Sequence, residues 1–472
     1  MNDTSGGAAK KIGVISLGCA KNRVNSEQMM FLIKSAGYQV TGETKGADAV
    51  VVNTCAFIES AQSEAIDTIL ELGEEKKKQG TGKIIVAGCL AQRFAGEIMR
   101  ELPEIDAVVG TGSFDRIVEA LDGALSGGQK PELFGDIDSP VSETGRIIST
   151  SNAWAYLKIA EGCDNRCAYC VIPDIRGRYR SRPMENIVKE AEDLVRRGIK
   201  ELIIVAQDVT RYGLDIYGEL RLSGLLRALC GIEEIRWIRL HYLYPDEITE
   251  ELIDVIAEND KILKYLDIPL QHISDGILRK MNRRGSGAEI RALLERLRER
   301  IPGAVLRTSV ITGLPGEGDK EFEELCGFLR SAKIERAGIF TYSPQERTKA
   351  ALMNKPAAET AERRAEILTD IQSRVMDDFN NSRVGSVTTV LIEGISAGQR
   401  PGEGGRRGEG RRPGNRGNNT GRYYGRSFAE SPDVDGYITV TGSGIRPGDF
   451  IDVRITGARG GELSGVVYEY SK

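Results

Sequence analysis

Short apolar runs alternate with helical spacings along the first part of the chain, and this alternation predicts its fold. The predicted strands are residues 11–18, 48–53, 83–87 and 105–110, and the helical spacings cover 25–35 and 59–72. Apolar strands that are separated by helices are typical of a parallel sheet covered on both faces. We therefore expect residues 11–145 to form a doubly wound parallel α/β domain.

A second alternation of the same kind begins near residue 153. Its strand candidates are 154–160, 201–206, 236–242, 265–268, 304–311 and 337–341, with helices such as 184–197 and 289–300 between them. Six strand–helix units fall short of the eight in a complete (β/α) barrel. Residues 149–382 are thus predicted to form a partial, open (β/α)6 barrel with a long closing helix over 357–380.

The final part of the chain, residues 384–472, changes to short strands with period-two alternation and glycine-rich turns. The predicted strands are 386–393, 436–441, 449–456 and 464–470. This pattern predicts a small all-β barrel of OB-like size. The fold class of the whole chain is α/β.

A low-complexity segment, residues 398–426, interrupts the predicted β-barrel. It contains ten Gly, eight Arg and two Glu, which give it a local charge of +6. Such a composition buries too little apolar surface to fold alone, so we predict a disordered insert. The segment is either a solvated insertion without a function or a contact to the phosphate backbone of RNA.

Composition excludes several classes of protein. Charged residues make up 28% of the 472 residues and hydrophobic residues 40%, which excludes a wholly disordered or fibrous chain. The net charge of −5 excludes a bulk polycation. No stretch approaches the ~20 apolar residues of a membrane span, and the N-terminus lacks an apolar signal core. We expect a cytoplasmic protein without a membrane partner, in which eight cysteines more often bind metal than form disulfides.

Three cysteines lie within eight residues, directly after the first strand of the predicted partial barrel. Cys163, Cys167 and Cys170 have the spacing Cys-x3-Cys-x2-Cys. Three thiolates at this spacing can hold one face of a cubane iron–sulfur cluster and leave the fourth iron open for a cofactor or substrate. The alternative is a zinc site, but structural zinc normally takes four closed ligands, and no fourth Cys or His is near in sequence.

Three further cysteines, Cys19, Cys55 and Cys89, each lie at or just past the end of a predicted strand of the first domain. Parallel strands of one sheet have their carboxyl ends at the same edge, where open α/β sheets bind ligands. This placement predicts a second group of three thiols. The alternative is three independent core cysteines. The last two cysteines, Cys230 and Cys326, lie in apolar helical contexts and are expected to pack in the core.

The turn Gly313-Leu314-Pro315-Gly316-Glu317 follows the fifth strand of the partial barrel. A glycine turn at a strand's carboxyl end lets a ligand approach the backbone, which here predicts a nucleoside-like cofactor. Tyr169 either lies against an adenine or is a core aromatic. Four arginines that crowd after the cysteine loop either serve an anionic substrate or form a solvated face; they are Arg176, Arg178, Arg180 and Arg182.

The Cys-x3-Cys-x2-Cys loop after the first barrel strand resembles that of radical S-adenosylmethionine enzymes. With Cys19, Cys55 and Cys89 and the C-terminal β-barrel, the chain resembles the methylthiotransferases, which have an N-terminal methylthiotransferase domain, a radical core and a TRAM domain. Five segments resemble the RimO branch, which modifies an aspartate of the twelfth small-subunit ribosomal protein; they are 16–22, 161–167, 172–177, 206–213 and 267–272. Two features depart from the branch pattern: Ala20 stands where Pro is frequent, and the Arg/Gly insert is not usual.

The resemblance implies a full set of cofactors. Cys163, Cys167 and Cys170 would hold one [4Fe–4S] cluster that binds S-adenosylmethionine, and Cys19, Cys55 and Cys89 a second that carries sulfur. The residues implied to contact S-adenosylmethionine are Tyr169, Gln207, Gly313 and Pro315. The implied partners are the aspartate-bearing loop of the ribosomal protein, an external electron donor and, through the Arg/Gly insert, ribosomal RNA.

Three alternatives remain open at this stage. The nearest is a tRNA adenosine methylthiotransferase similar to MiaB, although that branch typically has Gly-Gln-Asn-Val-Asn-Ser-Tyr where this chain has Ala206–Tyr212. The others are an iron–sulfur electron carrier and a pure RNA-binding module. The electron carrier does not explain the missing fourth ligands, and the RNA-binding module leaves six placed cysteines unexplained.

Overall fold

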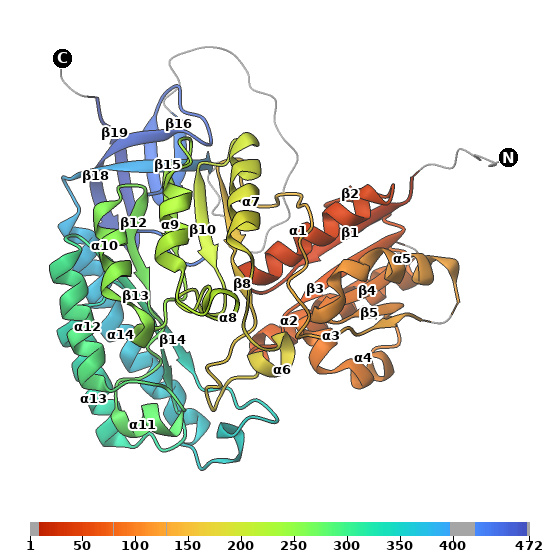
Figure 1. Cartoon of the computed structure of the whole chain (residues 1–472), viewed down its shortest axis with the longest axis horizontal. Coiled ribbons are helices and arrows are strands. Elements are labelled where there is room, and N and C mark those ends of the chain that lie inside the picture. The colour runs from red at the N-terminus through yellow and green to blue at the C-terminus, as the bar shows by residue number, and fades with distance from the viewer. Residues whose placement is uncertain (1–8, 79, 129, 397–420, 470–472) are drawn as a thin grey trace.

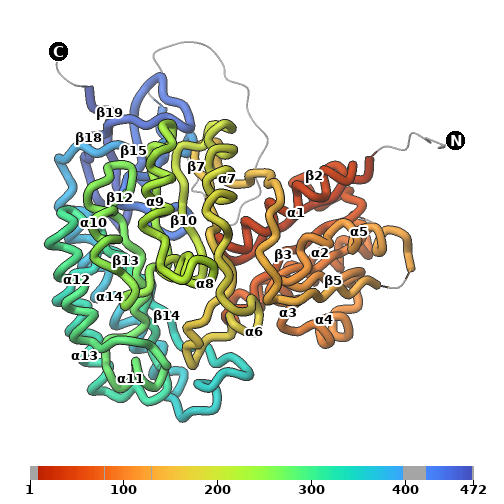
Figure 2. Tube along the Cα trace, in the orientation of Figure 1, coloured from red at the N-terminus to blue at the C-terminus, as the bar shows by residue number. Residues whose placement is uncertain are grey.

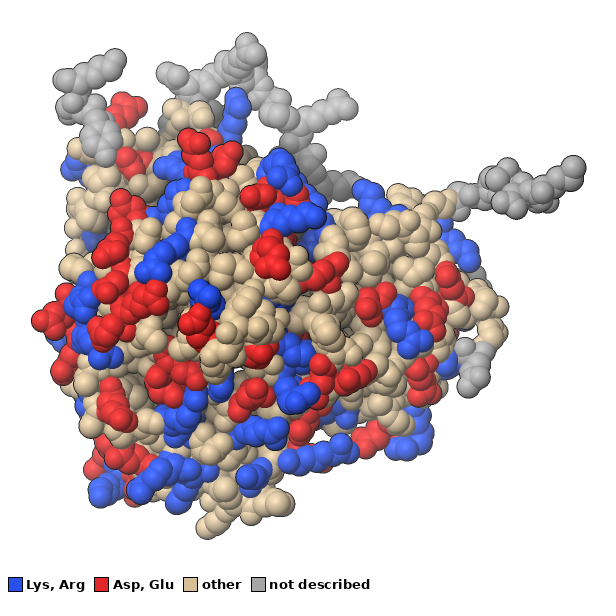
Figure 3. Space-filling view, in the orientation of Figure 1, with Lys and Arg blue, Asp and Glu red and all other residues tan. Residues whose placement is uncertain are grey.

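The computed structural model describes residues 9–78, 80–128, 130–396 and 421–469. It contains two parallel sheets and a β-barrel, which follow one another along the chain (Figure 1). No helix in these ranges is long and apolar enough to cross a membrane. Acidic and basic side chains are interspersed over the face drawn in Figure 3.

The N-terminal sheet has six parallel strands in the order β2-β1-β3-β4-β5-β6. They are β1 (Lys11–Ser16), β2 (Gln39–Thr41), β3 (Ala49–Thr54), β4 (Lys83–Gly88), β5 (Ala107–Val109) and β6 (Glu132–Leu133). The helices are α1 (Ala20–Ser35), α2 (Glu59–Lys77), α3 (Cys89–Arg93), α4 (Ala95–Glu101) and α5 (Ile117–Ser126), with a 3-10 turn at Thr111–Arg116.

Both faces of this sheet are covered, as predicted for a doubly wound domain. Alternate residues of β3 point to opposite sides, so that Val50 and Val52 pack with α2 and α3 while Ala49 and Val51 pack with α1 and α5. The strand order reverses between β1 and β3. In doubly wound sheets, the crevice at such a reversal is where ligands bind.

The central sheet has six parallel strands in chain order and stays open, which confirms the partial barrel. They are β7 (Trp154–Lys158), β10 (Glu201–Val205), β11 (Trp237–Leu240), β12 (Ile262–Asp267), β13 (Val305–Thr312) and β14 (Arg336–Thr341). The main helices are α7 (Met184–Arg196), α9 (Leu222–Cys230), α10 (Glu250–Glu258), α12 (Gly287–Arg300), α13 (Asp319–Ala332) and α14 (Ala358–Ser382). Shorter elements are the pair β8 (Ala160–Glu161) and β9 (Arg180–Ser181), helices α6 (Ile172–Arg176), α8 (Leu214–Tyr217) and α11 (Asp275–Lys280), and 3-10 turns at Pro245–Glu247 and Ala350–Leu352.

The C-terminal strands close into a five-stranded barrel in the order β15-β16-β17-β19-β18, in agreement with the predicted OB-like barrel. They are β15 (Val387–Ile395), β16 (Gly421–Arg426), β17 (Ile438–Gly442), β18 (Phe450–Arg459) and β19 (Glu462–Val467). Strands β15 and β18 pair to close the barrel.

Strand β16 corrects the predicted disordered insert, because residues 421–426 belong to the folded barrel. Tyr423 packs in the barrel core, and Arg426 is fully buried against Glu201 and Glu393. The Gly- and Arg-rich composition hid this strand, since its stability comes from pairing with β15 and β17 and not from apolar content. Residues 398–420 of the predicted insert lie outside the described residues.

The segment between β16 and β17 joins the barrel to the inner face of the central sheet. The Ser431 hydroxyl lies 2.8 Å from Nε2 of His241, and the Tyr265 hydroxyl donates to Asp435 over 2.7 Å. Ala429 packs among inward-facing residues of β7, β10, β12 and β13. This segment therefore fills the inside of the partial barrel, as side chains do in complete barrels.

Candidate active site

The structure brings together the three cysteines of the N-terminal domain. Cys19 follows β1 and precedes α1, Cys55 follows β3, and Cys89 opens α3 directly after β4. These three strands are neighbours in the sheet. Burial, followed by the nearby thiols of Cys89 and Cys19, raises the pKa of Cys55 to about 11. The three thiols therefore lie close enough to influence one another.

Two glycines with positive φ shape this thiol group. A Cβ on Gly18 (φ +83°) would lie 2.6 Å from the Cβ of Cys55, and one on Gly88 (φ +91°) would lie 2.3 Å from Oδ1 of Asn53. Asn22 fixes the same loops, because its Nδ2 donates to the carbonyl of Thr54 over 3.1 Å. Only glycine fits these close approaches at this backbone conformation.

The three cysteines of the central loop lie together on one segment, directly after β8. Gly162 (φ +82°) turns the chain, and the backbone N–H of Cys163 donates to the carbonyl of Gly177 over 3.1 Å. Nη1 of Arg283 donates to Sγ of Cys167 over 3.8 Å. Burial is the main cause that raises the pKa of Cys163 to about 11, and the nearby Cys167 acts in the same direction.

Both thiol groups fit iron–sulfur clusters of the cubane kind. Each has three thiols and a nearby cation, Arg283 for the central group and Arg176 for the N-terminal group, and a cation favours the thiolate form that binds iron. In the described ranges, no three His, Cys, Asp or Glu side chains are close enough to share one metal ion. A cubane does not require that convergence, because each thiolate binds a different iron atom.

Two of the residues implied to contact the cofactor lie in or beside the central loop. Tyr169 packs against the hydrophobic cluster that includes Leu314 of the turn after β13. Gln207 follows β10, and its Nε2 donates to Oε1 of Glu161 over 2.7 Å. Its own Oε1 is buried without a hydrogen-bond partner among the described residues, which leaves an acceptor available to a bound molecule.

The predicted glycine turn after β13 is packed against α14. A Cβ on Gly313 (φ +75°) would lie 2.4 Å from the Cβ of Ala361 on α14, and the Gly313 N–H donates to both carboxylate oxygens of Glu317 at 3.1 Å. The close approach of α14 thus requires glycine at this position. Pro315 is buried beside it.

Of the four arginines after the central loop, Arg176 has the contacts that sequence reasoning missed. It is 4% exposed, and its guanidinium reaches both Glu161 beside the central thiols and Sγ of Cys89 in the N-terminal group. Of the four, only Arg178 lies on a solvated face, since its side chain is 69% exposed. No sequence signal marks Arg176, because its partners lie 15 and 87 residues away.

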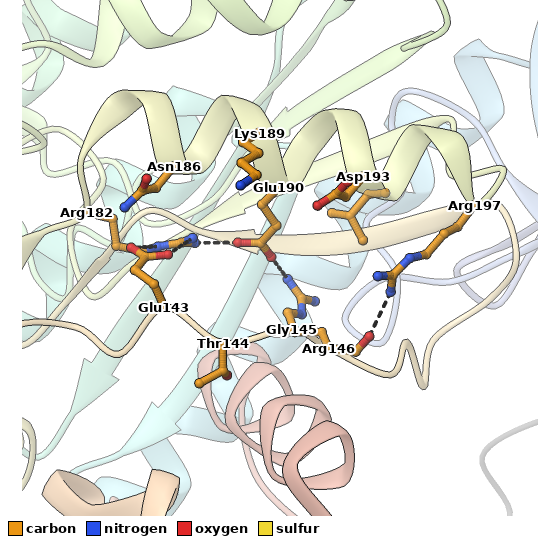
Figure 4. Close-up of a pocket in the computed structure, with 11 residues that line it drawn as sticks. Glu143, Thr144, Gly145, Arg146, Arg182, Asn186, Lys189, Glu190, Asp193 and Arg197 are labelled. Atoms are coloured by element: carbon orange, nitrogen blue, oxygen red, sulfur yellow. Dashed lines mark hydrogen bonds and ion pairs between the residues drawn. The ribbon is translucent and has the colours of Figure 1, made fainter. Parts of the chain in front are cut away.

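Buried ion pairs also hold the linker between the two domains. Arg146 contacts Glu27 of α1 at 2.6 Å and Glu190 of α7 at 2.5 Å, and Arg182 contacts Glu190 at 2.6 Å. Figure 4 shows Glu190 between the two guanidinium groups, in a pocket of about 230 Å³ lined by the linker and α7. Since the charges of this pocket bridge α1, the linker and α7, they fix the N-terminal domain against the partial barrel.

Comparisons with known proteins cover each part of this architecture. The radical SAM superfamily matches residues 157–329, the uncharacterized protein family UPF0004 matches 11–110, and the TRAM domain matches 415–467. A protein described as ribosomal protein uS12 methylthiotransferase RimO, from Caldanaerobacter subterraneus subsp. tengcongensis, is 44% identical over 97% of this chain and 99% of its own length. The chain belongs to the RimO family of radical S-adenosylmethionine methylthiotransferases.

A second RimO relative, from Pelotomaculum thermopropionicum, is 46% identical over 96% of this chain and 98% of its own length. Membership of the RimO family makes the chain an enzyme of the radical methylthiotransferase class. Among solved structures, the radical methyltransferase TsrM from Kitasatospora setae matches with a TM-score of 0.53 and 16% identity, over 71% of this chain and 77% of its own. At that identity the likeness concerns the fold alone.

Proposed function

We propose that this enzyme methylthiolates the β-carbon of an aspartate in ribosomal protein uS12, using two [4Fe–4S] clusters and S-adenosylmethionine. The observation that carries the proposal is the pair of three-thiol groups within a chain that is 44–46% identical to RimO relatives over nearly its whole length. We assign residues 11–145, 149–382 and 384–472 to the three domains of this enzyme.

Cys163, Cys167 and Cys170 would hold the cluster that binds S-adenosylmethionine. Cluster and cofactor would supply, on uptake of one electron from an external donor, a 5′-deoxyadenosyl radical, which can abstract hydrogen from a carbon that no side-chain base deprotonates. Gln207 offers its buried acceptor Oε1 on this side of the sheet, and Tyr169 offers a ring face beside Leu314. Gly313 and Pro315 shape the turn that positions Leu314.

Cys19, Cys55 and Cys89 would hold the second cluster, from which sulfur is delivered, and a second S-adenosylmethionine would supply the methyl group. These thiols lie at the carboxyl edge of the N-terminal sheet, and α6 joins this edge to the central loop (Figure 2). Val171 and Ile175 of this region pack in the hydrophobic core of the N-terminal domain. The two cysteine groups are therefore held on one packed unit, as delivery of sulfur from the N-terminal site to a substrate radical formed at the central site would require.

The test is peptide mass spectrometry of uS12 after anaerobic incubation with the reconstituted enzyme, S-adenosylmethionine and a chemical reductant. We expect the gain of one methylthio group in place of hydrogen on an aspartate. Unchanged uS12, together with altered methylthioadenosine in tRNA, would move the chain to the tRNA-modifying branch. Absence of 5′-deoxyadenosine would revive the electron-carrier alternative.

Two further proposals concern partners. We expect an external electron donor, because cleavage of S-adenosylmethionine to a radical takes up one electron, and a cytoplasmic location, because the proposed substrate is a ribosomal protein. A contact between residues 398–420 and ribosomal RNA stays a prediction from composition. Deletion of these residues should weaken modification of assembled subunits more than modification of free uS12, if the contact exists.

A further inference from the structure

Arg176 physically connects the two thiol groups. It ends α6, six residues after Cys170, and its side chain is buried. Nη1 donates to Glu161 over 3.1 Å and to Asn25 over 2.8 Å, while Nη2 donates to Asn22 over 3.0 Å and to Sγ of Cys89 over 3.4 Å. One side chain of the central domain thus donates a hydrogen bond to a thiol of the N-terminal domain.

The charges around Arg176 do not balance without an anion beside Cys89. Glu161 is shared with Lys158, which contacts it at 2.8 Å, so two buried cations face one buried carboxylate. A buried charge without a partner is costly. The remaining positive charge points toward the N-terminal thiols, where a thiolate-ligated cluster would supply the opposite charge.

We propose that Arg176 is a positioning residue that raises the reduction potential of the N-terminal cluster. This inference rests on the proposed function, which assigns a cluster to Cys19, Cys55 and Cys89. Hydrogen bonds to the sulfurs and local charge set the potential of iron–sulfur clusters. Adding one electron makes the cluster more negative by one charge, and the guanidinium beside Cys89 stabilises that reduced form.

The experiment uses the full chain with Cys163, Cys167 and Cys170 replaced by Ala, so that only the N-terminal site can hold iron. Iron content and the midpoint potential, from a redox titration followed by electron paramagnetic resonance, are measured with and without Arg176→Met. We expect full iron content and a shift of the potential to more negative values in the variant. An unchanged potential at full iron content would overturn the inference.

Two further variants keep the test decisive. Arg176→Lys retains the charge but loses the forked donors, so we expect a negative shift smaller than that of Arg176→Met. If Arg176→Met does not fold, an unchanged potential in Arg176→Lys overturns the inference. Arg178→Met is the matched control, because this neighbouring arginine is mostly exposed and pairs with Asp138 at 3.4 Å; its potential should not move.

Failure of the proposed function gives a different result. If the variant without the three central cysteines binds no iron, while the unmodified chain binds one cluster, the N-terminal site holds no cluster and the proposed function fails. If that variant binds iron but its reduction potential does not depend on residue 176, only the role of Arg176 is refuted.

Discussion

The two thiol groups of this enzyme are assembled in opposite ways. The central group comes from a single loop, and its three cysteines lie within eight residues. The N-terminal group comes from three loops, 36 and 34 residues apart, which meet because β1, β3 and β4 are neighbours in one parallel sheet. Local backbone turns set the first group, whereas sheet topology sets the second.

The cations beside the two groups extend this contrast. Arg283, which donates to Cys167, belongs to the same domain as that cysteine. Arg176, which donates to Cys89, belongs to the central domain, whereas Cys89 belongs to the N-terminal domain. The N-terminal group is therefore completed by a residue of the neighbouring domain. We expect a change at Arg176, although it belongs to the central domain, to alter the N-terminal group, whereas changes in the N-terminal sheet should leave the central group intact.

The largest expected effects come from single ligand replacements. Cys163→Ser should abolish both the formation of 5′-deoxyadenosine and the methylthiolation of uS12, since the radical arises at the central site. Cys55→Ser should keep 5′-deoxyadenosine and lose only sulfur insertion. Chromatography of 5′-deoxyadenosine and peptide mass spectrometry measure the two outcomes. Full methylthiolation by Cys55→Ser would contradict the two-cluster assignment.

Substitution of Gly18, which lies next to the predicted cluster ligand Cys19, tests whether loss of the cluster can be distinguished from backbone strain. Gly18→Ala and Gly37→Ala both place a side chain at positive φ, which costs about 1–2 kcal/mol of folding free energy. Only at position 18 would the new Cβ collide with Cys55, because nothing lies within 4 Å of the Cβ position at Gly37. We expect Gly18→Ala to lose about half of the bound iron and Gly37→Ala to lose none, by iron analysis and thermal unfolding. Equal iron in the two variants would show that sheet geometry tolerates displacement of Cys55.

A charge cluster away from both thiol groups tests whether effects on stability and on iron are separable. Burial alone would raise the pKa of Glu430, but the charges of Arg383 and Arg336 outweigh it and hold the pKa at about 2. Because the folded pKa lies below the unfolded value, the stabilisation is present above pH ~4.5 and is lost as the pH falls toward 2.

Glu430→Gln should therefore lower the free energy of unfolding by about 3 kcal/mol at pH 7. The difference from the unmodified protein should shrink below pH ~4.5, as followed by denaturant unfolding at a series of pH values. The iron content at pH ~7 should be the same in both proteins. A difference that stays constant down to pH ~2.5 would show that the carboxylate charge is not what stabilises this site.

The smallest effects are expected at the two cysteines outside both groups. Cys326 packs in the core of the partial barrel and Cys230 at its margin. Replacing either by Ala should cost about 1 kcal/mol or less and leave iron content and both activities unchanged. Loss of iron in either variant would show that the replaced cysteine contributes to one of the two iron sites.

Much of this architecture follows from local sequence patterns, and the exceptions have physical causes. The alternation of apolar runs and helices predicted both parallel sheets, and the placement of Cys19, Cys55 and Cys89 at strand ends predicted their convergence. Strand β16 was missed because its Gly- and Arg-rich residues are stabilised by pairing with β15 and β17. The packing reason for glycine at position 313 could not be predicted, because Ala361, the residue that requires it, lies 48 positions away.

By itself, the sequence determined the spacing of the central cysteines, the periodicity of the strands and helices, and the resemblance to methylthiotransferases, because each is a property of neighbouring residues. Tertiary structure decided which charges meet: Arg176 with Cys89, Glu430 with Arg383, and the segment after β16 with His241. Such pairs depend on strand order and on how the domains pack. A buried charge finds its partner across the fold, where local propensity carries no information about it.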